Sequence, residues 1–235
     1  MHIPDGFLDP KIAGGLVGIA VMVLGYCLSK VKQAVTAVVP EAALAAAGKG
    51  LRSISIGSKR VLTKFGENLL LKMGAVASLV FAAQMFNFPI DGGTSGHLIG
   101  GVLAVVILGP FAGSLVIAAV LTVQSFFFAD GGIVAIGANI VNMSIIGALI
   151  SYYIYIALKK ILPETASIML TAWFSVIMAA LACSLEIGFS GSVALNTIIP
   201  AMVKTHAIIG MAEAFITIAL LNLFWQMVPS EDENR

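Results

Sequence analysis

Charged residues are scarce in this sequence. They make up 11% of its 235 residues, whereas soluble domains carry roughly 25%. Hydrophobic residues make up 59%, and the mean hydropathy is +1.03. This balance excludes an ordinary soluble domain. It predicts an all-α integral membrane protein, with residues 1–235 as a single membrane domain.

Cysteine and the common catalytic motifs are also lacking. Cys27 and Cys183 lie inside apolar runs and form no CxxC pair, which argues against a thiolate metal centre. They are either buried thiols that act as small hydrophobic side chains or partners in a disulfide. There is no P-loop, nucleophile elbow, HExxH or dinucleotide fingerprint. We therefore expect no enzyme, and any ATP-driven work would need another polypeptide.

No basic region precedes the first apolar stretch, so the amino terminus does not resemble a signal peptide. One of only three histidines in the chain is His2. Beside a free terminus, the α-amine, the amide nitrogen of residue 2 and its imidazole Nδ1 can all reach one cation. They close a five-membered and a six-membered chelate ring, and one more nitrogen would complete a planar set that suits Ni(II) or Cu(II). The alternative is a disordered terminal residue.

Seven apolar runs predict about seven transmembrane helices. They cover residues 12–29, 68–87, 97–109, 111–128, 133–158, 165–187 and 198–228. The third run is short and is separated from the fourth by Gly109-Pro110, so we expect a short helix and its return partner. Gly14 and Gly18 have GxxxG spacing, which indicates either a close contact, with a partner protein for example, or ordinary internal packing.

Residues 30–67 form a basic segment. Its cations are Lys30, Lys32, Lys49, Arg52, Lys59, Arg60 and Lys64. We expect a short interfacial helix at residues 42–47 and loop or amphipathic surface structure after it, facing lipid or a partner protein in the cytoplasm. Nucleic acid is a poor candidate partner for a segment beside a membrane.

The distribution of positive charge predicts the orientation in the membrane. Of 13 Lys and Arg residues, eight lie between residues 30 and 72, which places the first loop in the cytoplasm and the amino terminus outside. Alternation from there puts Lys159 and Lys160 inside, in agreement with the rule, and the carboxyl-terminal tail in the cytoplasm. The same topology places His2, His97 and His206 near the outer face.

Two further polar groups interrupt the apolar runs. His97 follows a glycine-rich stretch, where irregular backbone at membrane depth is tolerated only if it is buried in protein or lines a cavity. Its imidazole could ligate a metal ion or cap the following helix. His206 and Glu213 are two helical turns apart on one face, and we expect His206 to support a ligand rather than to be one. Glu213 could hold backbone groups or pair with a polar neighbour.

The segment after the fourth run carries Asp130 in an Asp-Gly-Gly turn. Asn139 and Asn142 follow, three residues apart and so on one helix face. Polar groups in a span must be satisfied internally. These two side chains either orient a ligand or hold helices together by hydrogen bonds.

Several of these stretches together resemble the CbiM/NikM family, the substrate-capture subunits of energy-coupling-factor (ECF) transporters for nickel and cobalt. The resemblance rests on Met1-His2-Ile3-Pro4-Asp5-Gly6, Ser95-Gly96-His97-Leu98, Ala129-Asp130-Gly131-Gly132, Gly137-Ala138-Asn139, Asn142-Met143, and His206 with Glu213. It implies a six-helix S-component core with an extra N-terminal helix, and an extracytoplasmic tail, residues 1–11, that binds metal.

The resemblance also implies a metal site and partners. The amine of Met1, the amide and side chain of His2, and His97 would hold the ion, which is the transported substrate; no organic cofactor is implied. Ser95 in its Ser-Gly-His setting favours Ni(II), with Co(II) open. A transmembrane coupling subunit, two ATPase subunits and a small accessory membrane subunit are the implied partners, in a bacterial or archaeal cytoplasmic membrane.

Two other functions stay open on the sequence alone. One is a membrane scaffold or sensor whose histidines are structural. The other is a stand-alone channel or secondary transporter, which would need a polar path through the bilayer; the inner halves of the spans offer little beyond Glu213.

Overall fold

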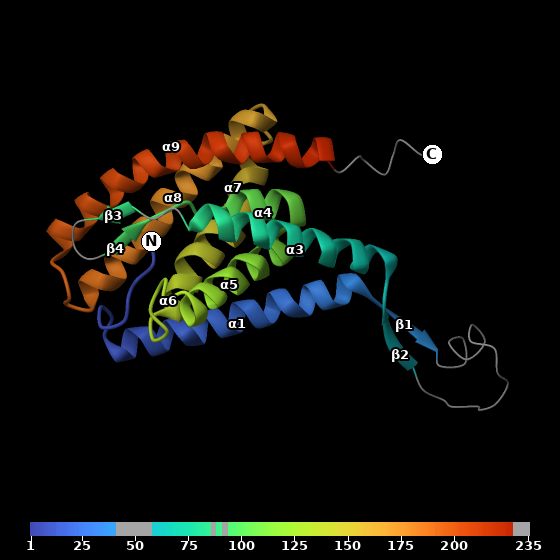
Figure 1. The fold of residues 1–235 in the computed structure, drawn as a ribbon, viewed down its shortest axis with the longest axis horizontal. Coiled ribbons are helices and arrows are strands. Elements are labelled where there is room, and N and C mark those ends of the chain that lie inside the picture. Colours follow the sequence, from blue (N-terminus) through green and yellow to red (C-terminus); the bar gives the residue numbers. More distant parts are fainter. Residues whose placement is uncertain (41–57, 86–87, 91–93, 228–235) are drawn as a thin grey trace.

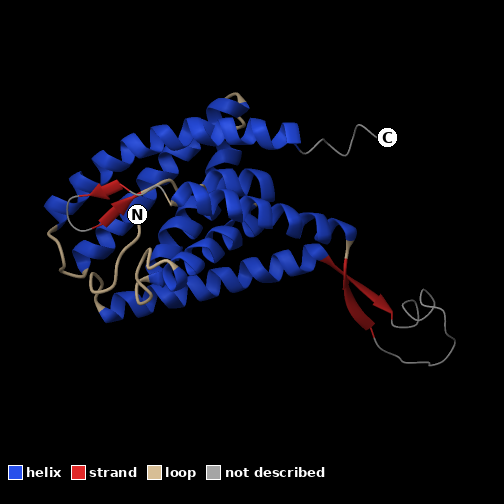
Figure 2. Ribbon diagram, viewed as in Figure 1, coloured by secondary structure: helices blue, strands red, loops and turns tan. Residues whose placement is uncertain are grey.

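The fold is a helical bundle with two small hairpins (Figures 1 and 2). The computed structural model describes residues 1–40, 58–85, 88–90 and 94–227. The helical elements are α1 (Pro10–Val35), α3 (Lys64–Gln84), α4 (Gly101–Leu108), α5 (Pro110–Phe127), α6 (Ile136–Ile140), η1 (Val141–Ile150, a π-helix), α7 (Ser151–Leu158), α8 (Glu164–Phe189) and α9 (Leu195–Met227).

Six spans in the described residues are long and apolar enough to cross a membrane. They are α1, α3, α5, the continuous α6–η1–α7 segment, α8 and α9. The third apolar run forms the short helix α4, which is buried along most of its length. The expected all-α membrane fold is confirmed. Of the seven expected transmembrane helices, six are long enough to span a membrane in the described residues, and the third is short. The third helix begins at Gly101 and not at His97, because residues 97–100 have irregular backbone.

Helix α1 begins where its sequence predicts and then lies along the outside of the bundle. Asp9 caps it by accepting a hydrogen bond from the Lys11 amide at 2.8 Å, and Pro10 occupies the first turn. Gly14 and Gly18 face open space, with no heavy atom within 4 Å of a Cβ built at either position. The internal-packing interpretation of the GxxxG spacing is therefore wrong.

Two antiparallel hairpins join the helices. Strands β1 (Thr36–Pro40) and β2 (Ser58–Leu62) extend from the ends of α1 and α3, as Figure 1 shows. The segment after residue 47 was expected to be loop or amphipathic surface structure, but its residues 58–60 belong to the paired strand β2. The predicted helix at 42–47 lies outside the described residues. Strands β3 (Phe88–Ile90) and β4 (Thr94–Gly96) lead into residues 97–100.

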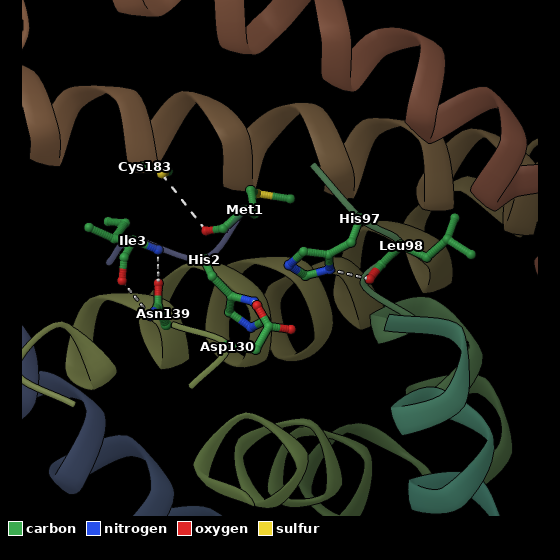
Figure 3. Close-up of polar contacts among 8 residues, drawn as sticks. All are labelled: Met1, His2, Ile3, His97, Leu98, Asp130, Asn139 and Cys183. Atoms are coloured by element: carbon green, nitrogen blue, oxygen red, sulfur yellow. Dashed lines mark hydrogen bonds and ion pairs between the residues drawn. The ribbon is translucent and has the colours of Figure 1, made fainter. Parts of the chain in front are cut away.

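The core sits where α4, α5 and η1 meet α8 and α9. Val102 and Ala104 of α4 are fully buried, as are Ala172 and Val176 of α8. Of residues 1–8, which precede α1, the first three are buried and lie inside the bundle beside Asn139 of α6 and Cys183 of α8 (Figure 3), whereas Asp5 and Gly6 are exposed. We call residues 1–8 the tail and residues 97–100 the loop.

Candidate metal centre

The tail is held inside the bundle by backbone hydrogen bonds. Met1 and Ile3 are both 0% exposed. Asn139 of α6 accepts a hydrogen bond from the Ile3 amide at 2.8 Å and donates one to the Ile3 carbonyl at 3.2 Å, a two-point contact drawn in Figure 3. The Gly132 amide donates to the same carbonyl at 2.9 Å. One side chain thus sets the register of the first residues.

A second anchor lies further along the tail. The Asp5 carboxylate accepts from the amides of Ile133 and Val134 at 3.2 and 2.8 Å, just before α6 begins. Free amides at the start of a helix favour an anion. A Cβ at Gly132 would overlap the Asp5 carboxylate, and one at Gly131 would crowd the His2 ring. Glycine in the Asp-Gly-Gly turn therefore lets the tail approach this closely.

Asp130 fixes the His2 imidazole. Its Oδ1 lies 2.8 Å from Nδ1 of His2, and the preceding Ala129 adopts φ +53°, a left-handed conformation that costs about 1 kcal/mol or more. Nε2 of His2 is buried without a hydrogen-bond partner. The predicted six-membered ring needs Nδ1 turned towards the amide nitrogen of His2. Here Nδ1 is directed to the Asp130 carboxylate instead.

His97 lies against His2. The two ring centroids are 4.4 Å apart and the rings are tilted by 32°. Nδ1 of His97 donates to the carbonyl of Leu98 at 2.7 Å, and its buried Nε2 has no hydrogen-bond partner. A carbonyl only accepts, so this contact places the proton on Nδ1 and leaves a lone pair on Nε2, the form that ligates metal ions.

The loop that carries His97 is tied to two helices. The Glu213 carboxylate of α9 accepts from the amides of Ile99 and Gly100 at 2.7 and 2.9 Å. From α3, Gln84 donates to the Ile99 carbonyl at 2.7 Å. Glu213 is only 2% exposed, so both bonds are shielded from water. This carboxylate takes the place of the helical partners that the loop amides lack.

His206 is buried in α9 in the same chemical form as His97. Its Nδ1 donates to the Met202 carbonyl at 2.8 Å, and its Nε2 has no hydrogen-bond partner. The chain amine, His2 and His206 lie close enough to His97 to contribute to the lowering of its pKa, and the His2 ring adjoins it. Three imidazoles therefore lie around the buried terminus.

The other predicted residues have separate roles or lie outside the site. Asn142 donates to Oε2 of Glu186 in α8 at 2.7 Å, so the two asparagines of one helix face serve different partners. Ser95 belongs to β4, and its side chain lies outside the described part of the chain. The two cysteines are free and buried, so no disulfide joins them.

Three contributors to this region were not predicted. In the sequence, Asp5 is only one residue of the terminal motif. The signal that could have identified it is a carboxylate near the terminus, which can bind the free amides at the start of a helix. Glu186 is an acid within an apolar run, a signal that a search for intramembrane carboxylates would find. Cys183 lies with its Sγ 4.0 Å from the Met1 carbonyl, which no pattern in the sequence indicates.

Burial makes the nitrogen donors of the site poor bases. It lowers the pKa of the Met1 amine from 8.0 to about 5. Burial is also the main cause that lowers the pKa of His2, and it lowers the pKa of His97 well below its ordinary value. At neutral pH all three groups are therefore uncharged and hold lone pairs.

The arrangement offers nitrogen ligands and few anionic ones. No cluster of three or more His, Cys, Asp or Glu side chains in the described residues is arranged to hold a metal ion. Two adjoining imidazoles, a buried amine and main-chain nitrogen nevertheless gather at the inner end of the tail. Neutral nitrogen donors suit late first-row metals such as Ni(II), Co(II) and Cu(II).

Comparison with known proteins supports a common family and fold. The family model described as "Cobalt uptake substrate-specific transmembrane region" (CbiM) matches residues 42–231. A protein of Archaeoglobus fulgidus whose name, NikMN, describes a fused nickel transport protein is 37% identical over 94% of this chain and 64% of its own length. LarMN of Lactiplantibacillus plantarum, likewise named as a fused nickel transport protein, is 31% identical over 98% of this chain and 66% of its own length.

The chain thus spans about two thirds of each of these two relatives. Among solved structures, the crystal structure of a truncated transition metal transporter superposes with a TM-score of 0.79 and 29% identity. The match covers 97% of this chain and 100% of that one.

Proposed function

The chain belongs to the CbiM family of cobalt uptake substrate-specific transmembrane regions, and on that premise we propose that it captures Ni(II) for import, with Co(II) as the alternative ion. The observation that supports this most strongly is the burial of the chain terminus against two imidazoles. Ordinary terminal residues are frayed and solvated. Here the first three residues are buried, and Asn139 holds the backbone of Ile3.

The proposed donors are the Met1 amine, the main-chain nitrogen and Nδ1 of His2, and Nε2 of His97. Binding would turn the His2 ring about its Cβ–Cγ bond, away from its present contact with Asp130. His206 would then support the site with its lone pair on Nε2. A planar set of four nitrogens favours Ni(II) over ions that prefer oxygen or tetrahedral ligands.

Charge balance supports a divalent ion at this position. A doubly charged ion inside a protein is costly unless nearby negative charge offsets it. Loss of the proton from the His2 amide supplies one negative charge, and Asp130 beside His2 supplies the second. The two neutral histidines add no charge, so the loaded site would be neutral overall.

We place the chain in a bacterial or archaeal cytoplasmic membrane, with the tail outside and the carboxyl terminus in the cytoplasm. The Lys and Arg of residues 30–72 support this orientation. The ion would enter from outside. ATP hydrolysis would take place in two separate ATPase subunits, joined to this chain through a transmembrane coupling subunit of an ECF complex. A small accessory membrane subunit is a further candidate partner.

The test changes the length of the tail. Inserting two glutamines between Met1 and His2 keeps a bulky second residue, so that Met1 is retained, and moves the imidazole too far along the chain to share adjoining chelate rings with the amine. We expect Ni(II) affinity, measured by isothermal titration in detergent, to fall at least 100-fold, as it should for His2→Ala. The matched control inserts two glutamines after Lys160, in the turn between α7 and α8, and should bind as the natural chain does.

Tight nickel binding by the lengthened tail would exclude this site. The same titrations separate the other functions: a scaffold or sensor with structural histidines predicts no metal in any variant. Nickel uptake by vesicles that hold this chain alone, without ATPase subunits, would instead favour a stand-alone transporter.

A further inference from the structure

A groove opens at the opposite end of the bundle from the tail, where α3 begins (Figure 1). It lies between the start of α3 and the junction of α4 with α5, and its volume is about 630 Å³. The lining residues are Lys64, Phe65, Asn68, Leu69, Lys72, Ile107, Leu108 and Gly109. The proposed metal site uses none of them, so the groove needs an explanation of its own.

Two cations lie along one wall of the groove. Lys64 and Lys72 are eight residues apart on α3, about 12 Å along the helix axis. Within the part of the chain that the structure describes, neither forms an ion pair. Glu67, the acid of the same helix turn, does not line the groove. An anion between the two ammonium groups would meet positive charge on both sides.

The opposite wall is apolar. Ile107 and Leu108, at the end of α4, line it together with Phe65 and Leu69 of α3. Phe65 is 62% exposed, which is unfavourable in water but suits contact with hydrocarbon. Gly109 leaves open space at the rim, because a Cβ there would meet no heavy atom within 4 Å. The groove therefore combines a positively charged region with a hydrophobic region.

Its depth matches the edge of a bilayer. Lys64 is the first residue of the α3 span, and Lys72 lies within the first half of it. Long lysine side chains at such positions extend their ammonium groups to the headgroup level. The nearby end of α1 adds the exposed cations Lys30 and Lys32, and Figure 1 shows that end beside the start of α3. Anionic lipids concentrate near such basic surfaces.

We propose that this groove binds an anionic phospholipid, whose phosphate lies between Lys64 and Lys72 and whose acyl chain covers Phe65, Leu69 and Ile107. Charge favours a lipid as the occupant: two ammonium groups without an ion pair in the described residues, beside apolar side chains, match an anionic headgroup and its acyl chain.

The experiment counts bound lipid on the intact chain. Native mass spectrometry would follow the titration of detergent-solubilised protein with palmitoyl-oleoyl phosphatidylglycerol and, separately, with the matching phosphatidylcholine. We expect preferential retention of phosphatidylglycerol, and a loss of roughly 10- to 30-fold in its affinity in a Lys64→Gln/Lys72→Gln variant. Ile107→Trp, which fills the groove without a change of charge, should weaken binding as well.

The control variant Lys11→Gln/Lys160→Gln removes the same charge away from the groove and should retain the lipid. Equal loss in that control, or equal retention of phosphatidylcholine by the natural chain, would overturn the proposal. Displacement of the lipid by 10 mM inorganic phosphate would show a free-anion site instead, and displacement by an acidic helical peptide alone would show a protein-docking site. Nickel titration of the same variants should be unchanged, so the result is independent of the metal site.

Discussion

The tail and the loop bring their histidines to the same place but are held in different ways. The loop is continuous with β4 and α4 at its two ends, and side chains from α3 and α9 bind its backbone. The tail is joined to the bundle at one end only, and its own Asp5 provides part of the attachment. The loop is therefore a fixed half of the site, and the tail is a half that can be released.

Two amides allow the halves to be compared directly. Ile3 donates to Asn139 in the tail, and Ile99 donates to Glu213 in the loop, at 2.8 and 2.7 Å. Both belong to isoleucine and both are buried, so their hydrogen-exchange protection factors report the two attachments on one scale.

Acid should give the largest difference in hydrogen-exchange protection between the tail and the loop. The released tail carries an amine of pKa 8.0, whereas the docked amine has a pKa of about 5, so the released state binds more protons between these values. The stabilisation of the docked state is fully present above pH 8 and is lost as the pH falls towards 5. We expect tail docking to weaken by up to roughly 10³-fold over this range.

The lowered pKa of His2 acts in the same direction. Acid also opposes burial of His97 in the loop, whose pKa is lowered as well, but the loop is held at both ends. The Ile3 protection factor, corrected for the intrinsic exchange rate, should therefore fall more with acid than that of Ile99. Equal losses for the two amides would show that the halves open together.

Removal of the Glu213 carboxylate should loosen only the fixed half. Glu213→Leu leaves the buried amides of Ile99 and Gly100 without acceptors, at about 1–3 kcal/mol each. We expect nickel affinity to fall about 100-fold and protection at Ile99 to disappear, with Ile3 still protected. Glu213→Gln keeps an acceptor oxygen and should behave closer to the natural chain.

The corresponding change in the releasable half is Asn139→Leu. It removes the acceptor of the Ile3 amide, while the Ile3 carbonyl keeps its bond from Gly132. We expect about a tenfold loss of nickel affinity and exposure of the Ile3 amide. Asn142→Leu makes the same substitution on the same helix face but affects Glu186 instead. Loss of Ile3 protection in that control would mean that Asn139 does not hold the tail specifically.

Asp5→Asn should have the smallest effect. The amide oxygen of asparagine can still accept from Val134, but the negative charge at the start of α6 is gone. A charge at such a position contributes about 0.3–1 kcal/mol. Nickel affinity should therefore fall only a few-fold, measured by the same titration. A loss as large as that of Asn139→Leu would make Asp5 the main anchor.

The sequence predicts the helices and the irregular loop better than it predicts the hydrogen bonds that hold the tail and the loop in place. Hydrophobic length and composition are sufficient for the spans, and the glycine-rich approach to His97 marks irregular backbone. The helix was predicted to start at His97, but α4 starts at Gly101. Gly100 adopts φ +69°, and the Ile99 amide binds a carboxylate more than 100 residues away. Local pattern does not contain such a partner.

The same limit explains the roles of the asparagines and of Asp5. A spacing of three residues places Asn139 and Asn142 on one face, and the structure has both of them buried. Asn139 binds the tail, whereas Asn142 binds Glu186. This difference depends on the neighbours of each position in the folded structure, which the spacing does not show. Likewise, the charge pattern of residues 30–67 shows only that the segment is basic. It does not indicate that β1 pairs with β2.

The two-point contact at Ile3 also has a consequence for the order of folding. The bonds from the tail to Asp130, Asn139 and Ser192 join residues 128, 136 and 185 positions apart in sequence. Such distant contacts are slow to form, since the intervening chain must be ordered first. Residues 1–8 are synthesised before α6 and α8 and yet can be placed only after them. The ability to bind metal would therefore appear last during assembly and would distinguish a finished molecule from an incomplete one.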